Sequence, residues 1–493
     1  MLKSIQKKPF VLVLGWLVLA LITCYFRDMW GDEVTKFDHL GGSLTQAFHK
    51  IFLEQAPFAH GEMLLDWLSW KFLSGFLPLN IWTRVPSLFF ALLIWVTAIT
   101  VVQEEENKDL GPLYLLLLFF SSGLMWYSTE MRSYSALMFN GALSFMLVTR
   151  TAPLKVSHFG LIVVSAFLGH IYGICFTAAA LGARALLKVK SRQSRIEAGL
   201  CALIAGAALF YVWLLLTRYN TYSGAAYAGS GGLRVKYDRT VLPPVLDMVR
   251  QLFALLSNPK KVWPFFALLF VLGSVVRVVR SFRHLLGVGL FLLLILGPIF
   301  ATVVSGYMYY PRQAIAGLPV FLYYTAAGIA ALRGRFKTMA PALGSVPIII
   351  AAVSWFFTIW IPVQPLLNNP FLKYWKCIGA ADQAHAQNVM FANAWEWNTF
   401  VKYVRHRHVA APVVDDKMRI AGVEFLRLCW EAPNQRCYFV NNDSGVSLEP
   451  RGGYSPGGSL HKFLTDPSVK IDIVLHDFQD YPEDTGLPQA RCW

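Results

Sequence analysis

Long apolar runs separated by short polar segments dominate the chain up to about residue 361. The runs 11–22, 113–120 and 348–353 carry almost no polar side chains. A helix that crosses a bilayer needs about 20 mostly apolar residues, and the chain offers about eleven such segments. They are 10–26, 84–102, 111–125, 133–149, 157–170, 171–187, 196–217, 262–280, 285–304, 313–332 and 339–361. The pattern predicts an all-α polytopic membrane protein with about eleven transmembrane helices over residues 1–361.

Composition excludes the other broad classes of protein. The chain is 56% hydrophobic and 15% charged, whereas a soluble globular domain carries about 25% charged residues. An ordinary soluble protein, a disordered chain, collagen and a coiled coil are therefore excluded. The net charge of +15 is spread over short clusters between the apolar runs. This distribution indicates membrane lipids as partners, and not nucleic acid.

The basic clusters also set the expected orientation. Loops rich in Lys and Arg face the cytoplasm by the positive-inside rule. The clusters lie within 3–8, 188–195, 277–283 and 333–337, so the N-terminus is expected inside. A single crossing over 157–187 would place the 188–195 cluster outside. We therefore interpret 157–187 as two crossings, with His170 near an outer apex.

Three long regions are then expected on the outer side of the membrane. The loop 27–83 contains half-apolar segments such as 63–76, which are typical of juxtamembrane helices lying flat at the interface. The loop 218–261 is rich in Gly and Tyr. Two interpretations stay open for it: a loop that orders over a ligand, or a plain connector. The third region is 362–493.

Region 362–493 has shorter apolar runs and more charge than the rest of the chain. The segments 388–391, 437–440 and 471–475 are predicted strands, and 396–407 is a predicted helix. This region is therefore expected to be a small periplasmic α/β domain at the C-terminus.

Four of the seven cysteines of the chain fall in this C-terminal region. An even number of cysteines in a domain placed outside indicates two disulfides, with the pairing left open. A zinc site that uses the nearby His406 and His408 is the alternative, but no CxxC spacing supports it. The predicted disulfide cysteines are Cys377, Cys429, Cys437 and Cys492.

Ionisable residues beside the apolar spans are the candidate chemistry. Charged side chains are costly there, which makes them functional candidates by default. Asp32 and Glu33 follow the first span, and Glu130 and Arg132 precede the fourth. The structural alternatives are a solvated or helix-capping carboxylate for Asp32, and an interfacial side chain for Arg132. Arg84, which opens the second span, is interpreted mainly as an anchor to lipid headgroups.

The order of several short motifs resembles the GT-C superfamily of polyprenyl-phosphate-sugar-dependent glycosyltransferases. The resemblance is to bacterial members similar to protein O-mannosyltransferases and aminoarabinose transferases, and it covers roughly residues 10–332. Two features depart from the family pattern: Pro-Pro is absent near 61–64, and Arg312 follows a proline where an Arg-Tyr pair is common. The matching motifs are Asp32-Glu33, Arg-Val-Pro-Ser at 84–87, Ser-Thr-Glu-Met-Arg-Ser-Tyr at 128–134, His170 with Tyr172, and Tyr310-Pro-Arg312.

The resemblance implies an inverting transferase with a polyprenyl-phosphate-linked sugar as donor, such as one on undecaprenyl phosphate. Asp32 would be the general base, with Glu33 as the second candidate. One base suffices because the phosphate leaving group is already a stable anion, whereas a glycosidase uses two carboxylates. A guanidinium group can donate two parallel hydrogen bonds to two phosphate oxygens. This is the expected role of Arg132 and Arg312. The remaining candidates for substrate contacts are Glu130, Tyr134, His170 and Tyr310.

The same reading predicts the acceptor and the compartment. The acceptor would be a hydroxyl of a periplasmic glycan, lipid or protein of the cell envelope. The enzyme would lie in the bacterial inner membrane, with its active site and C-terminal domain facing the periplasm. No cofactor is expected. A divalent metal ion is not favoured, because Val34 follows Asp32 and Glu33 and no DxD motif stands in the first loop.

Two other functions stay open from the sequence. A flippase or transporter for a lipid-linked sugar would have similar spans and basic loops. The candidate charges, however, cluster at one membrane face, whereas carrier sites lie near the midplane. A ligase or oligosaccharyl transferase with a diphosphate donor would share the architecture and would differ in donor chemistry.

Overall fold

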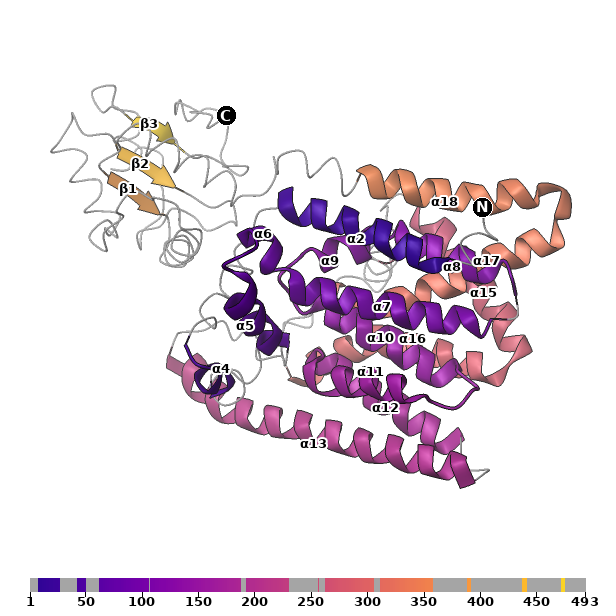
Figure 1. Ribbon diagram of the computed structural model, residues 1–493, viewed down its shortest axis with the longest axis horizontal. Helices are drawn as coiled ribbons and strands as arrows, with labels where there is room; N and C mark the ends of the chain where they lie inside the picture. The colour runs from indigo at the N-terminus through magenta and orange to yellow at the C-terminus, as the bar shows by residue number, and fades with distance from the viewer. Residues whose placement is uncertain are drawn as a thin grey trace. The chain divides into compact units, whose positions relative to one another are not determined.

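The computed structural model describes residues 8–26, 42–49, 62–105, 107–187, 192–229, 256, 262–305 and 311–357, and the strand segments 388–391, 437–440 and 471–474. The described helices belong to one unit of the chain and the strands to a second. Figure 1 labels the elements of both units.

Every range that the apolar pattern predicts to span the membrane carries at least one helix. The longer helices of this unit lie side by side along the horizontal of Figure 1. They are α2 (Pro9–Phe26), α7 (Val85–Gln103), α8 (Leu110–Phe119), α9 (Ser122–Ser128), α10 (Tyr134–Thr149), α11 (Val156–Leu168), α12 (Ile171–Leu187), α13 (Arg192–Gly229), α15 (Trp263–Arg280), α16 (Phe282–Ser305), α17 (Leu318–Arg335) and α18 (Ala340–Trp355). The other helical segments are α4 (Leu44–His49), α5 (Glu62–Leu73), α6 (Leu79–Trp82), η4 (Pro311–Gly317) and η5 (Lys337–Met339).

Five described segments are both long and apolar enough to cross a membrane. They are Val85–Gln103, Arg195–Leu214, Trp263–Arg280, Gln313–Arg335 and Lys337–Trp355, and the bent pair α8 and α9 makes a sixth if it counts as one span. The other apolar helices contribute stretches of only 10–17 residues, less than the length of a straight crossing: Pro9–Tyr25, Tyr134–Thr149, Val156–Leu168, Ile171–Leu187 and Phe282–Pro298. The prediction of a helical membrane-type unit is therefore confirmed, while the expected eleven crossings exceed this count.

A serine cap explains why one apolar run forms two helices. Helices α8 and α9 meet at an angle of 49°. Ser121 accepts a hydrogen bond on Oγ from the N–H of Leu124 at 3.2 Å, which caps the start of α9. Serine is a preferred N-cap because its oxygen satisfies a free N–H of the first turn. The leucine-rich helix α8 therefore ends, and a new helix starts in another direction.

Helix α10 forms the centre of the helical unit. Every residue from Tyr134 to Val148 is buried. A Cβ atom at Gly141 would overlap the carbonyl of Ala316, so glycine permits the close approach of η4. Further along, the ring of Phe145 lies 4.9 Å from that of Tyr323 in α17. The chain from η4 into α17 thus runs beside α10 in the same direction.

A polar cluster links α10 to α11 and α12 inside the apolar bundle. Nδ2 of Asn140 lies 2.5 Å from Oγ of Ser165 and 3.2 Å from Oγ1 of Thr177. The two hydroxyls are themselves 2.7 Å apart. All three residues are fully buried. Buried polar groups in an apolar medium need such partners, so this cluster fixes how α11 and α12 pack on α10.

The second unit contains a three-stranded parallel sheet. Its strands are β1 (Asn388–Phe391), β2 (Cys437–Val440) and β3 (Ile471–Val474), in the spatial order β1-β2-β3. Asn388 pairs with Cys437, and Cys437 pairs with Ile471. The segment 396–407 and the cysteines Cys377, Cys429 and Cys492 lie outside the described residues. The α/β domain and its disulfides therefore stay predictions.

Candidate functional site

Three of the candidate residues that the structure describes, Glu130, Arg132 and Tyr134, lie where α9 ends and α10 begins. Glu130 and Arg132 lie in the short connection between these helices. Ser135 Oγ donates a hydrogen bond of 2.9 Å to the carbonyl of Tyr127, which ties the first turn of α10 to the end of α9. We call this part of the bundle the Tyr134 end, and the part where α10 ends the Arg150 end.

Helix α7 holds the connection at both ends. The Nε of Arg84 donates a hydrogen bond of 2.6 Å to the carbonyl of Thr129. Ser87 Oγ donates one of 3.2 Å to the carbonyl of Arg132. The first turn of α7 thus positions the segment from Glu130 to Arg132.

The burial of Arg84 corrects the prediction that it mainly anchors lipid headgroups. Its side chain has no exposed surface, so it lies inside the protein. Sequence reasoning could have noticed that Arg84 directly precedes the Val-Pro pair that starts α7. A cation at that position faces the neighbouring helices of a bundle as readily as the headgroups.

The Arg132 side chain lies beside two tyrosines. Its guanidinium carbon is 5.9 Å from the ring centroid of Tyr134, within the range of a cation–π contact. The rings of Tyr127 and Tyr134 meet edge to face at 5.1 Å. Arg132 is half-buried, while Tyr134 is 8% exposed. One charged and two aromatic side chains therefore share this part of the Tyr134 end.

Glu130 is the buried acid of the same connection. Only 4% of its surface is exposed. A carboxylate removed from water needs nearby cations or hydrogen-bond donors to remain charged. Its position between two residues whose carbonyls are held by α7 fixes its backbone.

The backbone of Arg312 belongs to η4. Ala316, four residues further along η4, lies against Gly141 of α10. The side chain of Arg312 lies outside the described residues.

His170 separates α11 from α12 and caps the second helix. Its Nδ1 accepts a hydrogen bond of 3.2 Å from the N–H of Tyr172, and its carbonyl accepts one of 2.8 Å from Ile174. Its ring stacks on Tyr172 at 5.4 Å. The break between two helices agrees with the expected apex, and the capping bonds give His170 a structural task there.

Other predicted site residues lie outside the described residues. They are Asp32, Glu33 and Tyr310, and the side chain of Arg312 belongs with them. Their assignments stay predictions. Among the described residues, no group of three or more His, Cys, Asp or Glu side chains is placed to hold a metal ion.

Helix α5 adds polar side chains that sequence reasoning passed over. Asp66 and Ser69 are buried at 3% and 4% exposure. Ser69 Oγ donates a hydrogen bond to the carbonyl of Trp82, just before α7 begins. The segment 63–76 was expected to lie flat at the interface. Its helix buries Met63, Asp66 and Trp67 against the protein at the Tyr134 end, and its position at the membrane interface stays a prediction.

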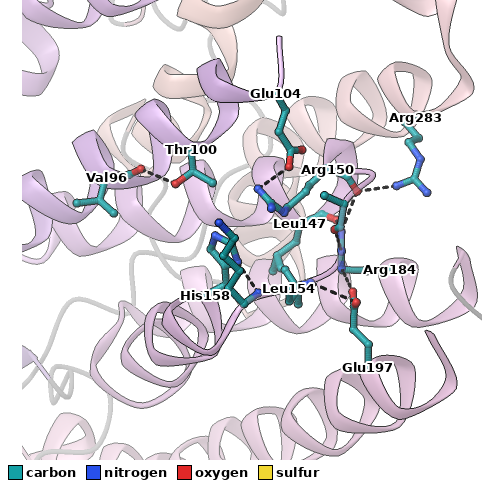
Figure 2. A network of polar contacts seen from close by, with 12 residues as sticks. Val96, Thr100, Glu104, Leu147, Arg150, Leu154, His158, Arg184, Glu197 and Arg283 are labelled. Atoms are coloured by element: carbon teal, nitrogen blue, oxygen red, sulfur yellow. Dashed lines mark hydrogen bonds and ion pairs between the residues drawn. The ribbon is translucent and has the colours of Figure 1, made fainter. Parts of the chain in front are cut away.

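The opposite end of the bundle carries a second polar network, shown in Figure 2. Arg184 has no exposed surface and pairs with Glu197 at 2.7 Å. Its other donors reach the carbonyls of Leu147, Arg150 and Ala152 at 2.8–2.9 Å. The carbonyls of Leu147 and Arg150 belong to the last turn and the C-cap of α10, where carbonyls have no partner within the helix, and Ala152 follows in the next connection. This network therefore caps α10 and ties it to α12 and α13.

Comparison with known proteins adds no relative. No protein-family model matches the chain, and neither a curated protein nor a solved structure matches it.

Proposed function

We propose that this protein is an integral membrane inverting glycosyltransferase that uses a polyprenyl-phosphate-linked sugar. The observation that carries the proposal is the arrangement at the Tyr134 end. There the Arg84–Thr129 and Ser87–Arg132 hydrogen bonds fix a connection that bears Glu130 and Arg132. Cations and tyrosines at the end of a helical bundle suit a donor whose phosphate lies at the membrane surface and whose tail lies in lipid.

The proposed topology has eleven passes, with the Tyr134 end outside. Basic residues gathered at the Arg150 end support this orientation: Arg184 and Arg283 both donate to the carbonyl of Arg150, and Arg150 and Arg277 pair with Glu104 and Glu105. Loops rich in arginine favour the cytoplasmic side. The shorter helices would complete their crossings together with neighbouring segments. The donor site would then face the periplasm of a bacterial inner membrane.

The proposed reaction needs one base and two cations. The base, Asp32 or Glu33, removes the proton from the acceptor hydroxyl as its oxygen attacks the anomeric carbon. The bond from that carbon to the phosphate oxygen breaks, and the electron pair leaves with the polyprenyl phosphate. Arg132 and Arg312 would stabilise this anion. Attack from the face opposite the phosphate inverts the anomeric configuration.

The aromatic and buried polar residues would position the sugar. Tyr134 offers a ring face and a hydroxyl beside Arg132, and tyrosine suits such mixed surfaces. Glu130, His170 and Tyr310 are the further candidates for sugar or acceptor contacts. Arg84 is a positioning residue, because it acts through the carbonyl of Thr129.

The experiment compares sugar transfer by the full chain and its variants in lipid nanodiscs. The donors are undecaprenyl phosphates that carry different sugars, and released undecaprenyl phosphate is measured by mass spectrometry. Asp32→Asn is expected to lower turnover by about 10²–10⁴-fold, the usual contribution of a general base, while donor binding persists. Wild-type turnover in both Asp32→Asn and Glu33→Gln would overturn the assignment of the base.

Mass spectrometry of envelope glycans, from cells with and without the chain, identifies sugar and acceptor together. A sugar lost from a glycan, lipid or protein only when the chain is absent agrees with the proposal. A transporter differs in the purified system, because it moves the labelled donor between leaflets and leaves the sugar attached. That outcome would replace the transferase with a flippase. Loss of activity on chelation, with lipid diphosphate released, would indicate a diphosphate donor.

A further inference from the structure

A pocket of about 330 Å³ opens at the Arg150 end of the helical unit. Its walls come from the α7–α8 connection, the end of α10, the α15–α16 connection and the middle of α17. The volume is within the range of small-molecule sites, about 300–1,000 Å³. Its charged lining consists of Glu104, Glu105, Arg150, Arg277, Arg280 and Arg283.

Both carboxylates that line the pocket form ion pairs with arginines of the same lining. Glu104 pairs with Arg150 at 2.7 Å, and Glu105 pairs with Arg277 at 2.8 Å. The second oxygen of Glu105 accepts a hydrogen bond of 2.6 Å from the hydroxyl of Tyr323. These contacts neutralise two of the four arginines and hold the walls in place.

Two arginines keep their positive charge without a carboxylate partner among the described residues. The Nη1 of Arg283 donates a hydrogen bond of 2.8 Å to the carbonyl of Arg150. Arg280 is exposed and forms no ion pair with any described residue. The described residues that line the pocket therefore carry an excess of two positive charges.

We infer that this pocket binds a phosphate group, held by Arg280 and Arg283. Guanidinium groups match the geometry of phosphate oxygens and remain charged at all physiological pH values. The pocket lies at an end of the apolar helices, where the phosphates of lipid headgroups also lie. Either an anionic phospholipid headgroup or a soluble phosphate can supply this chemistry. The site is at the opposite end of α10 from Arg132, so it does not depend on the proposed transferase activity.

Native mass spectrometry of the full chain in a neutral detergent tests the inference. The probes are phosphatidylglycerol, diacylglycerol, which lacks the phosphate, and inorganic phosphate as competitor. Phosphatidylglycerol is expected to bind the wild type about tenfold more tightly than Arg280→Gln, since a charge-assisted hydrogen bond contributes about that factor. Arg280→Gln is informative because Arg280 makes no described contact that supports the fold.

Matched variants separate this site from general surface charge. Arg335→Gln removes an exposed arginine of α17 that does not line the pocket, and it is expected to bind phosphatidylglycerol like the wild type. Glu104→Gln removes the partner of Arg150 and is expected to tighten binding severalfold. Weaker binding in Glu104→Gln would contradict the charge argument.

Competition by inorganic phosphate would assign the site to phosphate from either source. Phosphatidylglycerol binding that resists inorganic phosphate but falls in Arg280→Gln would assign it to the headgroup. Equal phosphatidylglycerol affinity in the wild type, Arg280→Gln and Arg280→Gln/Arg283→Gln would overturn the inference. Diacylglycerol binding as tight as phosphatidylglycerol would overturn it too.

Discussion

Arg84 and Thr129 are joined by a hydrogen bond of 2.6 Å from a guanidinium Nε–H to a backbone carbonyl, in a region where neither residue is exposed. The bond links the first turn of α7 to the chain between α9 and α10. It places a buried positive charge directly beneath the connection that carries Glu130 and Arg132.

Replacement of Arg84 should therefore harm both stability and activity. A hydrogen bond from a charged group contributes about 1.5–3 kcal/mol to the free energy of unfolding. Arg84→Gln is expected to lose about that amount, measured by thermal unfolding in detergent. Ser87→Ala, which removes a neutral hydrogen bond to the same connection, should lose only about 1 kcal/mol. Equal losses in both variants would argue against a special role for the buried charge.

Arg132→Gln should raise the KM for the donor about tenfold to a hundredfold, because one charge-assisted contact to phosphate is lost. The connection should keep its place on α7, since the hydrogen bond from Ser87 uses the carbonyl of Arg132, while the cation–π contact with Tyr134 is lost. Arg335→Gln is the control for charge alone. Unchanged donor KM in Arg132→Gln and in Arg312→Gln together would defeat the phosphate assignment.

Gly141 should tolerate no side chain. Gly141→Ala places a methyl group against the carbonyl of Ala316 and is expected to destabilise the protein by about 1–3 kcal/mol. Gly182 on α12 has open space around its Cα, and Gly182→Ala should be neutral or stabilising by about 0.5–1 kcal/mol. The two variants have the same chemical change. Similar unfolding temperatures for both would mean that η4 does not pack closely on α10.

The Asn140 cluster should contribute measurably to the packing of α11 and α12. Interhelical hydrogen bonds in membrane proteins contribute about 0.6 kcal/mol on average and reach about 1.7 kcal/mol. Asn140→Ala is expected to lie near the upper value, because it leaves Ser165 and Thr177 with one partner fewer. A double-mutant cycle with Ser165→Ala measures the coupling between the two residues. A coupling energy of zero would show that Asn140 does not bond to Ser165.

The cysteines offer a test of the outer C-terminal domain. The other three cysteines, Cys24, Cys175 and Cys201, lie in the described helices. With two disulfides in region 362–493, a thiol label added to the unfolded protein should react at three cysteines before reduction and at all seven after it. Labelling at all seven without reductant would exclude the disulfides and favour a reduced or metal-bound domain.

The helical membrane-type unit could be predicted from hydropathy because apolar length is a local property. Segments such as 84–102 and 262–280 match α7 and α15 within a few residues. The actual lengths were harder to predict. Hydropathy does not reveal that Ser121 caps a new helix, so the segment 111–125 was expected to be one span and forms two helices.

The candidate site could be predicted only in part, because its geometry depends on contacts between distant segments. Glu130 and Arg132 were found from their place before an apolar span. The importance of Arg84 depends on Thr129, which lies 45 residues further along the chain. The pocket at the Arg150 end also joins four separate segments, and none of them carries a motif that marks it.

The complete enclosure of α10 has a consequence for how this sequence can vary. A helix that faces lipid must avoid polar side chains, whereas α10 contacts only protein and contains Ser135, Asn140 and Ser144 at buried positions. Selection on this segment therefore acts on the shape of the side chains and on their hydrogen-bond partners more than on their hydrophobicity. An α10 rebuilt from leucine would gain hydropathy and lose the fit to its neighbours, so insertion into the membrane and correct assembly would become separable steps.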